Sequence, residues 1–338
     1  MNKQIAHTKQ PYLVAIHCMV YNHAPFLREC LEGFVMQQTT FPFVAIVHDD
    51  ASTDNSASII REYETKYPHI FKPIYQTENQ YSKPGASVLR IMDAAIRETG
   101  AKYIAICEGD DYWIDPYKLQ KQVDFMEQHP EYAMCHTNCG IFNQETQTLL
   151  LNKEKSIGSD NYLNYLLNRK NIISTLTVLY KREVYEKLPR HYSKKAFLMS
   201  DFPLWIEFAH SGRIKLIEDV TAVYRVLPNS ASHSPNLSRH LRFMNSVRDI
   251  RLFYAKIYNI ELEKGGYTKN HITDIMHNAF IQNNYLLARR YIMIAHITKT
   301  YSIYILFYFI GTLSPFLNLL TKKMINTYHR CKTLLNKL

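Results

Sequence analysis

The chain has 338 residues, 46% of them hydrophobic, with 40 Lys and Arg against 30 Asp and Glu. A chain of this length can bury a sizeable core and is far too long to need disulfide staples. Its six cysteines form no paired framework, which favours a reduced, cytosolic setting.

The positive charge lies mainly in the last third of the chain. Residues 231–338 contain 15 Lys and Arg and 4 Asp and Glu, a net charge of +11, which leaves −1 for residues 1–230. We therefore expect a globular domain over 1–235 and a basic helical region over 236–338. Basic appendages bind polyanions, either nucleic acid or an anionic membrane face. The first twelve residues lack the apolar core of a secretory signal.

Apolar runs alternate with amphipathic stretches through the first 130 residues, which predicts successive strand–helix units. Strands are expected at 12–20, 43–47, 71–75 and 103–107, and helices at 26–37, after Asp54, at 83–100 and at 115–130. Such units imply a mainly parallel sheet with helices on both faces. Later elements are a strand at 172–180, a helix start at 201–209, one or two strands at 214–224, and helices beyond about residue 240.

Three polar clusters follow strands of this predicted sheet. They are Tyr21-Asn22, Asp49-Asp50 and Glu108-Gly109-Asp110-Asp111. Ligands of parallel α/β sheets bind at the carboxyl ends of the strands, so we expect the three clusters to act together.

The acidic loop of residues 108–111 places three carboxylates within four residues. They repel one another unless a cation lies between them, and oxygen ligands of this kind suit Mg²⁺ or Mn²⁺. Gly109 permits a tight turn and the close approach of a ligand. Taken alone, the loop is equally a solvated acidic turn in which Asp111 or Asp115 caps a helix.

Asp49 and Asp50 also have two interpretations. A carboxylate at a strand end can accept hydrogen bonds from a base N–H and a ribose hydroxyl. The same residues can instead cap the next helix and interact with its dipole.

Together these motifs resemble the inverting family 2 glycosyltransferases of bacteria, which have the GT-A fold. The resemblance covers residues 12–140 and, more loosely, extends to about 235. It rests on Tyr21-Asn22, the Asp-Asp-x-Ser-x-Asp run at 49–54, the DxD-like Glu108-Gly109-Asp110, and Asp-Pro-x-Lys-Leu-x-x-Gln at 115–122. One difference is Glu108, where Asp is more usual.

The resemblance implies roles for particular residues. Asp110 would be the metal ligand, Asp49 and Asp50 would contact the nucleoside, and Tyr21 and Asn22 would line the same pocket. Glu108 and Asp111 would complete the nucleotide-sugar site.

The resemblance also points to residues further along the chain. The segment 199–205 (MSDFPLW) resembles the start of the base-bearing helix, which gives Asp201 the role of general base, although it can equally be a helix cap. Arg225 would contact phosphate. His233 would bind phosphate or the metal, unless it is simply a surface loop residue.

Residues 301–320 form a twenty-residue segment without a charge, followed by five Lys and Arg and no acid at 322–338. The segment could just span a bilayer, but Gly311, Pro315 and its polar residues favour an interfacial helical hairpin on an anionic membrane. The alternative is a helical subdomain packed on the catalytic core.

We therefore expect an α/β, GT-A-type glycosyltransferase with a basic helical C-terminal extension. It would use a divalent metal, Mn²⁺ or Mg²⁺, and a nucleotide-sugar donor such as a UDP-sugar, with a glycan or lipid-linked acceptor. We expect it on the cytoplasmic face of the inner membrane, without nucleic acid as a partner.

Two alternatives remain. A nucleotidyltransferase would need a glycine-rich phosphate loop, which residues 21–25 lack. A non-catalytic membrane-associated scaffold is suggested only by Glu108.

Overall fold

The computed structural model describes residues 12–81, 83, 87–228, 236–300, 303–313 and 317–324, which form two compact units. The first contains the described residues up to Tyr162, with Ile172–His191 and Glu207–Leu227. The second contains Leu163–Asn171, Tyr192–Ile206 and the described residues from Pro228 onward. The second unit thus includes two segments from within the predicted catalytic domain, residues 1–235.

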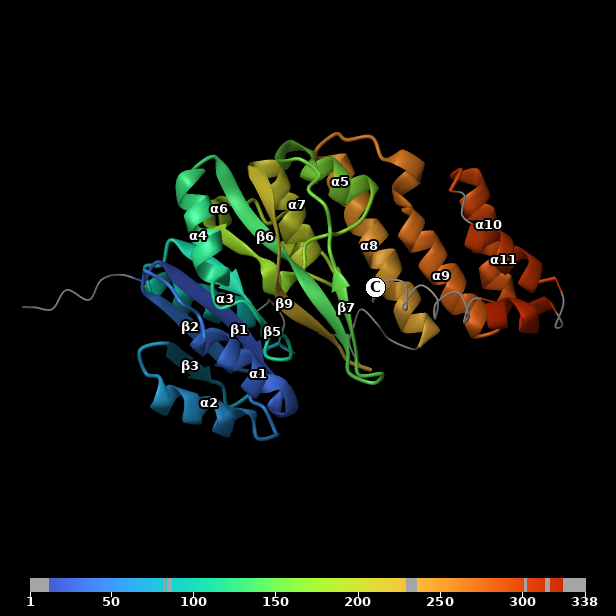
Figure 1. Ribbon diagram of the computed structural model, residues 1–338. Helices are drawn as coiled ribbons and strands as arrows, with labels where there is room; N and C mark the ends of the chain where they lie inside the picture. The colour runs from blue at the N-terminus through green and yellow to red at the C-terminus, as the bar shows by residue number, and fades with distance from the viewer. Residues whose placement is uncertain are drawn as a thin grey trace, which may run out of the picture. The chain divides into compact units, whose positions relative to one another are not determined.

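A nine-stranded mixed sheet is the centre of the first unit (Figure 1). Its strands follow the order β3-β2-β1-β4-β8-β6-β9-β5, and β7 pairs with β6. The strands are β1 Val14–Val20, β2 Phe43–Asp49, β3 Phe71–Tyr75, β4 Tyr103–Ile106, β5 Tyr112–Trp113, β6 Tyr132–Asn143, β7 Thr148–Asn152, β8 Leu179–Lys181 and β9 Arg213–Val226.

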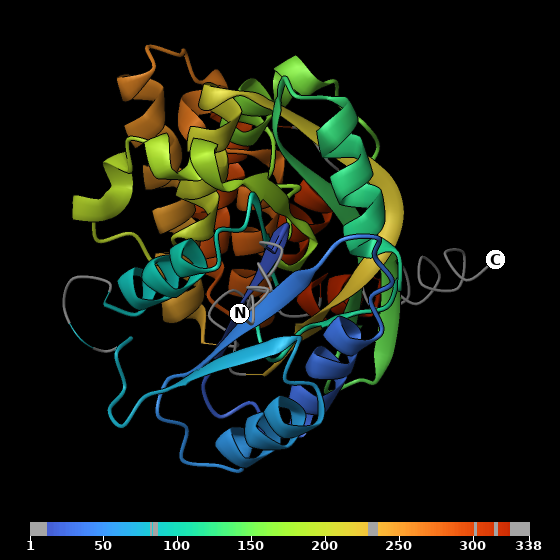
Figure 2. The ribbon, with the colours of Figure 1, turned by 90° about the vertical axis from the view of Figure 1, so that its left-hand side faces the viewer.

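The strands β3, β2, β1 and β4 are parallel, as the apolar runs predicted. Strand β1 lies between two neighbours, and its residues Val14 to Ile16 are fully buried because helices cover both faces of the sheet. The helices α1 (Ala24–Val35) and α2 (Ser56–Lys66) lie on one side of these strands, and α3 (Ser87–Glu98) lies on the other (Figure 2). The helix α4 spans Lys118–Gln128.

The strand predicted at 172–180 is wrong for most of its length. Residues Thr175–Thr177 form a 3₁₀ turn, and β8 begins only at Leu179. Side chains satisfy this backbone in place of a strand neighbour: the Trp113 indole N–H donates to the Leu176 carbonyl at 2.8 Å, and the Gln122 amide donates to that of Thr177 at 2.9 Å.

Three helices lie between β7 and β9 in the chain, namely α5 Tyr162–Asn168, α6 Arg182–Lys187 and α7 Asp201–Ser211. The later helices confirm the helical character predicted for the C-terminal region. They are α8 Leu237–Ile257, α9 Lys269–Ile281, α10 Tyr285–Ile297 and α11 Ile303–Gly311, with residues 317–324 also helical. Short 3₁₀ turns occupy Ser159–Asn161, His191–Lys194 and Glu263–Gly266.

Polar side chains fix the starts of three of these helices. Asn236, Thr268 and Asn284 each accept a hydrogen bond from the backbone N–H three residues later, which satisfies a donor that the helix leaves unpaired. A core that includes Ile272, Met276 and Phe280 joins α9 to α10 and α11. Within the described part of the chain, no helix combines the length and apolar character needed to cross a bilayer.

Candidate functional site

The three polar clusters lie at one edge of the parallel strands. Val20 at the end of β1 is in register with Asp49 at the end of β2. The Gly109 N–H of the acidic loop donates to the Met19 carbonyl of β1 at 3.0 Å. The backbone therefore brings together the residues that the sequence placed at separate strand ends.

The loop after β1 is hydrogen-bonded to the loop after β2. Asn22, in a left-handed conformation with φ of 57°, donates its N–H to the Ser52 hydroxyl at 3.0 Å and accepts from the Thr53 N–H at 2.8 Å through its side chain. The Asp54 carboxylate accepts from the Ala24 N–H at 3.0 Å. Asn22 therefore holds the two loops together. Its predicted contact with the nucleotide-sugar, and that of the half-exposed Tyr21, stay predictions.

Asp49 and Asp50 are both buried, but their carboxylates differ. The Asp50 carboxylate accepts hydrogen bonds from the backbone N–H groups of Gln80 at 2.7 Å and Tyr81 at 2.9 Å. Among the described residues, the buried Oδ1 of Asp49 has no hydrogen-bond partner. Buried polar atoms are rarely left unpaired, so this oxygen is available to a ligand. The capping alternative for the pair is not seen, because Asp54 binds the N–H of Ser56, the first residue of α2.

The acidic loop is compact. Glu108 is exposed, Asp110 is partly buried and Asp111 is buried, and one carboxylate oxygen from each lies within 4.8 Å of the others. Burial, reinforced by the charges of Asp110 and Glu108, raises the pKa of the Asp111 carboxyl well above its usual value. A bound cation would relieve this repulsion, so these residues fit a divalent metal.

Gly109 is needed for space. The loop makes the predicted tight turn, since the Asp111 N–H donates to the Glu108 carbonyl at 3.0 Å. The φ of Gly109 is not positive, however, so the turn itself does not require glycine. A Cβ at this position would lie 2.9 Å from the His23 Nδ1 and 2.9 Å from a methyl carbon of Val20. His23 thus packs directly against the acidic loop.

His23 was not predicted as a site residue. Its Nδ1 is buried and, within the described part of the chain, has no hydrogen-bond partner. Burial lowers the pKa of His23, although the charges of Asp110 and Asp54 oppose this shift. The available signal was its position directly after Tyr21 and Asn22.

Arg225 braces the acidic loop from inside the unit. Its side chain is only 4% exposed, and its guanidinium donates to the Asp110 carbonyl at 2.9 Å, to the Gln144 side chain at 2.8 Å and to the Glu29 carboxylate. Its backbone N–H donates to the Asp111 carboxylate at 2.7 Å. The guanidinium is thus occupied by protein groups, and the predicted phosphate contact stays a prediction.

Two further predicted residues are not among the contacts described above. Asp201 is the first residue of α7, is partly buried and belongs to the second unit. Its role as general base stays a prediction. His233 lies in the segment 229–235, outside the described residues.

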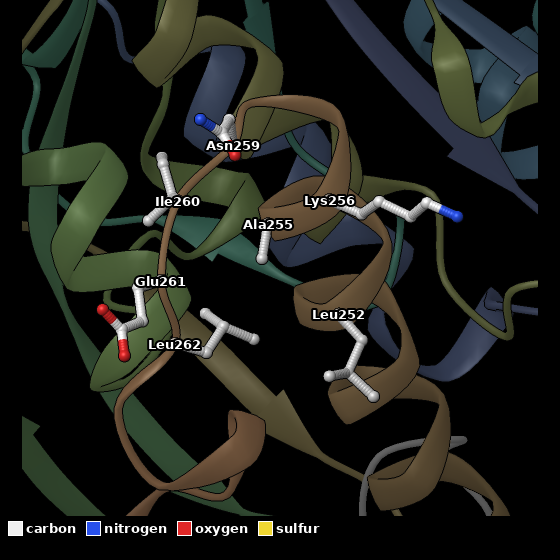
Figure 3. A pocket seen from close by; sticks show the side chains of 7 residues that line it. All are labelled: Leu252, Ala255, Lys256, Asn259, Ile260, Glu261 and Leu262. Carbon is white, nitrogen blue, oxygen red and sulfur yellow. The ribbon is translucent and has the colours of Figure 1, made fainter.

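The second unit has a hollow at the end of α8, with a volume of about 460 Å³ (Figure 3). Lys256 and Glu261 lie on its opposite sides, and its other lining residues are mainly apolar. It contains none of the predicted site residues, so we assign it no part in the chemistry.

The sequence profile of "Glycosyl transferase family 2" matches residues 16–189, just over half of the chain. The chain belongs to glycosyl transferase family 2. The match includes the loops after β1, β2 and β4, and so confirms the resemblance based on those motifs.

Several known proteins are similar in sequence. An uncharacterized protein of Mycobacterium tuberculosis is 34% identical over 227 residues, 67% of this chain and 62% of its own length. The chain thus matches less than two thirds of that relative. The uncharacterized glycosyltransferase EpsJ of Bacillus subtilis is 24% identical, over 68% of this chain and 67% of its own. TuaG of Bacillus subtilis, which its name assigns to teichuronic acid biosynthesis, is 28% identical over 65% of this chain and 81% of its own length.

Solved structures confirm the predicted fold class. The mannosyltransferase PcManGT from Pyrobaculum calidifontis, in complex with GDP-Man and Mn²⁺, superposes with a TM-score of 0.54 at 18% identity, covering 98% of this chain and 85% of its own. Residues 1–349 of TarS from Staphylococcus aureus, in complex with UDP, superpose with a TM-score of 0.50 at 15% identity. The match covers 91% of this chain and 82% of the TarS chain. The chain has a GT-A-type sheet with a helical C-terminal region.

Proposed function

We propose that the chain transfers a sugar from a nucleotide-diphospho-sugar to a hydroxyl of a glycan or lipid-linked acceptor, with inversion, in the synthesis of a cell-surface polysaccharide or lipopolysaccharide. Membership of family 2 supports sugar transfer. The observation that carries the proposal is the acidic group Glu108, Asp110 and Asp111 at the edge where β1, β2 and β4 end.

The acidic group would hold the divalent cation, Mn²⁺ or Mg²⁺, with Asp110 as its principal ligand. One carboxylate oxygen of Asp111 already accepts a hydrogen bond from the Arg225 N–H, and Glu108 is exposed. Asp110 is the member of the group that is neither buried nor fully solvated. A cation bound there supplies positive charge that stabilises a departing diphosphate. We do not assign His233 a position.

The nucleoside would bind beside Asp49 and Asp50, with Tyr21 and Asn22 along the same edge. A carboxylate oxygen accepts a hydrogen bond from a base N–H or a ribose hydroxyl, and the buried Oδ1 of Asp49 has no partner among the described residues. We expect a UDP-sugar as the donor.

Asp201 would act as the general base. Its carboxylate takes the proton of the acceptor hydroxyl while that oxygen bonds to the anomeric carbon and the bond to the diphosphate oxygen breaks. Because attack and departure occur on opposite faces of that carbon, one displacement inverts its configuration.

The basic C-terminal region, residues 236–338, would place this chemistry on the cytoplasmic face of the inner membrane. Its +11 surplus over residues 231–338 supports an anionic surface as the partner. A lipid-linked acceptor would be met at the same surface.

Thermal unfolding of the full chain with nucleoside diphosphates and nucleotide-sugars, with and without Mn²⁺, tests the proposal. Ligands that bind the folded state raise the Tm. We expect one nucleotide to raise it only when the metal is present. If no UDP-, GDP- or dTDP-sugar shifts the Tm with Mn²⁺, the chain is a non-catalytic scaffold of the same fold.

A further inference from the structure

We propose that the second unit carries a docking face for an anionic bilayer, formed by the exposed sides of α10, α11 and residues 317–324. The docking face would hold the enzyme where a lipid-linked acceptor lies, and in this purpose the inference rests on the proposed function. The docking itself is argued from exposure and charge.

Helix α10 exposes an apolar stripe. Leu286 is 84% exposed, Met293 64% and Ile297 71%. Their spacing of seven and four residues puts them on one side of the helix, whereas Ala288, Tyr291 and Ala295 are buried on the other. Isolated exposed apolar residues are ordinary, but a stripe along a whole helix indicates a binding surface.

Helix α11 repeats the arrangement. Leu306 and Phe309 are 55% and 47% exposed and share one side of the helix, while Tyr308 is buried at 3%. Leu313, in the turn after the helix, is 55% exposed. In the helical residues 317–324, Leu319 and Met324 are each more than half exposed. Three consecutive helical segments therefore each expose an apolar side.

Hydrogen bonds show that these segments adjoin one another. The Arg289 guanidinium on α10 donates to the Thr312 carbonyl at the end of α11. The Lys322 ammonium donates to the Asn283 side chain, in the turn before α10, at 2.8 Å. Leu313 follows Thr312 directly, and Leu286 lies about one helical turn after Asn283, so each of these two contacts has an exposed leucine close to it in the chain.

The charge of the face identifies its occupant. After Asp274 the sequence contains no Asp or Glu, and the Lys and Arg among the described residues of this stretch are 289, 290, 299, 322 and 323. Arg290 lies within the exposed stripe of α10, four residues after Leu286. Cations beside exposed apolar side chains match anionic headgroups above acyl chains. A second copy of this face would bring like charges together.

The helices are too short to cross the bilayer. At 1.5 Å per residue, the nine residues of α11 extend about 14 Å, roughly half of a 30 Å hydrocarbon layer. The docking is therefore peripheral, with Leu286, Met293 and Leu306 reaching the boundary between the headgroups and the acyl chains.

Co-sedimentation of the full chain with vesicles tests the inference. We expect binding to vesicles of phosphatidylglycerol and phosphatidylcholine, at least tenfold weaker binding to phosphatidylcholine alone, and release by salt. The double variant L286E/M293E should lose binding about a hundredfold, because it puts two carboxylates on the apolar stripe. R290E should lose it about tenfold or more.

A matched control is L149E/L151E, which adds two carboxylates at exposed leucines of β7 in the first unit. It should bind vesicles as the wild type does. Equal loss in this control, or equal binding to neutral vesicles, overturns the inference. If L286E/M293E does not fold, R290E and the salt titration decide.

Nucleotide binding in vesicle-free solution separates this inference from the proposed function. Docking variants should keep the metal-dependent Tm shift. If nucleotide raises the Tm of the chain but the chain does not bind anionic vesicles, the docking face alone is refuted. A chain that binds vesicles but no nucleotide refutes the proposed transfer instead.

Discussion

Asp111 and Arg225 define the electrostatics of the acidic loop at the scale of single residues. Burial raises the pKa of Asp111, and the charge of Asp110 adds to it, while the hydrogen bond from the Arg225 N–H opposes the shift. The guanidinium of Arg225 meanwhile binds the Asp110 carbonyl and Glu29. The buried Arg225 thus fixes the backbone at Asp110, the proposed metal ligand.

Replacing Arg225 by Lys should destabilise the protein by about 2–4 kcal/mol, because one ammonium cannot reach Glu29, Gln144 and Asp110 together. Urea unfolding measures the loss, and nucleotide affinity with Mn²⁺ should fall with it. E29Q is the control: Glu29 is 59% exposed, so its loss should cost below about 1 kcal/mol. Equal effects of both variants would contradict the bracing role.

Asp201 is tested by Asp201→Asn. Loss of a general base should slow transfer to an acceptor by about 10²–10⁴-fold and leave the donor Kd unchanged. Single-turnover transfer and donor titration measure the two quantities. S200A, which changes only a neighbouring hydroxyl, should stay within a few fold of wild type. Unchanged transfer in D201N would remove Asp201 from the mechanism.

The sequence predicted part of this arrangement. The acidic residues were recognisable because they follow apolar strands at the same edge. Glu29 and Arg225 are 196 positions apart, so their ion pair could not be foreseen. The Asn22 bonds to Ser52 and Thr53 were hidden in the same way, since they depend on two loops 30 residues apart.

At the scale of elements, the loop between β4 and β5 is held on the end of β1 by backbone and packing. Gly109 donates to Met19, and its Cα lies where a side chain would meet His23 and Val20. The position of the acidic group therefore depends on the absence of a side chain at residue 109.

Gly109→Ala should destabilise the protein by about 1–3 kcal/mol through overpacking, and should weaken Mn²⁺-dependent nucleotide binding. The double variant G109A/H23A relieves one of the two contacts. It should therefore be at least about 0.5 kcal/mol more stable than the sum of the single effects predicts. Urea unfolding of the four proteins completes the cycle, and strict additivity would refute the contact.

Strand β6 shows why some elements escaped prediction. Its segment HTNC carries polar residues that are nevertheless buried. Their partners are distant: Asn138 binds the backbone at 154 and 218, and Thr137 meets Thr221. A sequence pattern identifies apolar strands such as β1 to β4, but it does not reveal polar residues whose partners lie elsewhere in the chain.

At the scale of the whole molecule, two histidines with buried ring nitrogens tie stability to pH. Burial lowers the pKa of both His17 and His136 to about 4. The unfolded chain, with a pKa near 6.5, therefore binds more protons below that value, and stability is lost as the pH falls from about 6.5 to 4. The raised pKa of Asp111 acts in the opposite direction.

Between pH 7 and pH 5, each of these histidines should remove roughly 2 kcal/mol of stability. Urea unfolding at the two pH values measures the loss. H136Q, whose amide can still bond the Tyr162 hydroxyl, should show a loss of unfolding free energy smaller by the contribution of one histidine, roughly 2 kcal/mol. An H136Q protein with the wild-type pH dependence would contradict the buried, neutral state of His136.

Release of nucleoside diphosphate from a nucleotide-sugar, with and without Mn²⁺, tests the central claim most directly. We expect metal-dependent release by the wild type and a fall of at least about 100-fold in D110N, which removes one charge from the acidic group. The control D219N alters an exposed carboxylate and should match the wild type. Full release by D110N, or release that ignores the metal, would contradict a metal-dependent transferase centred on Asp110.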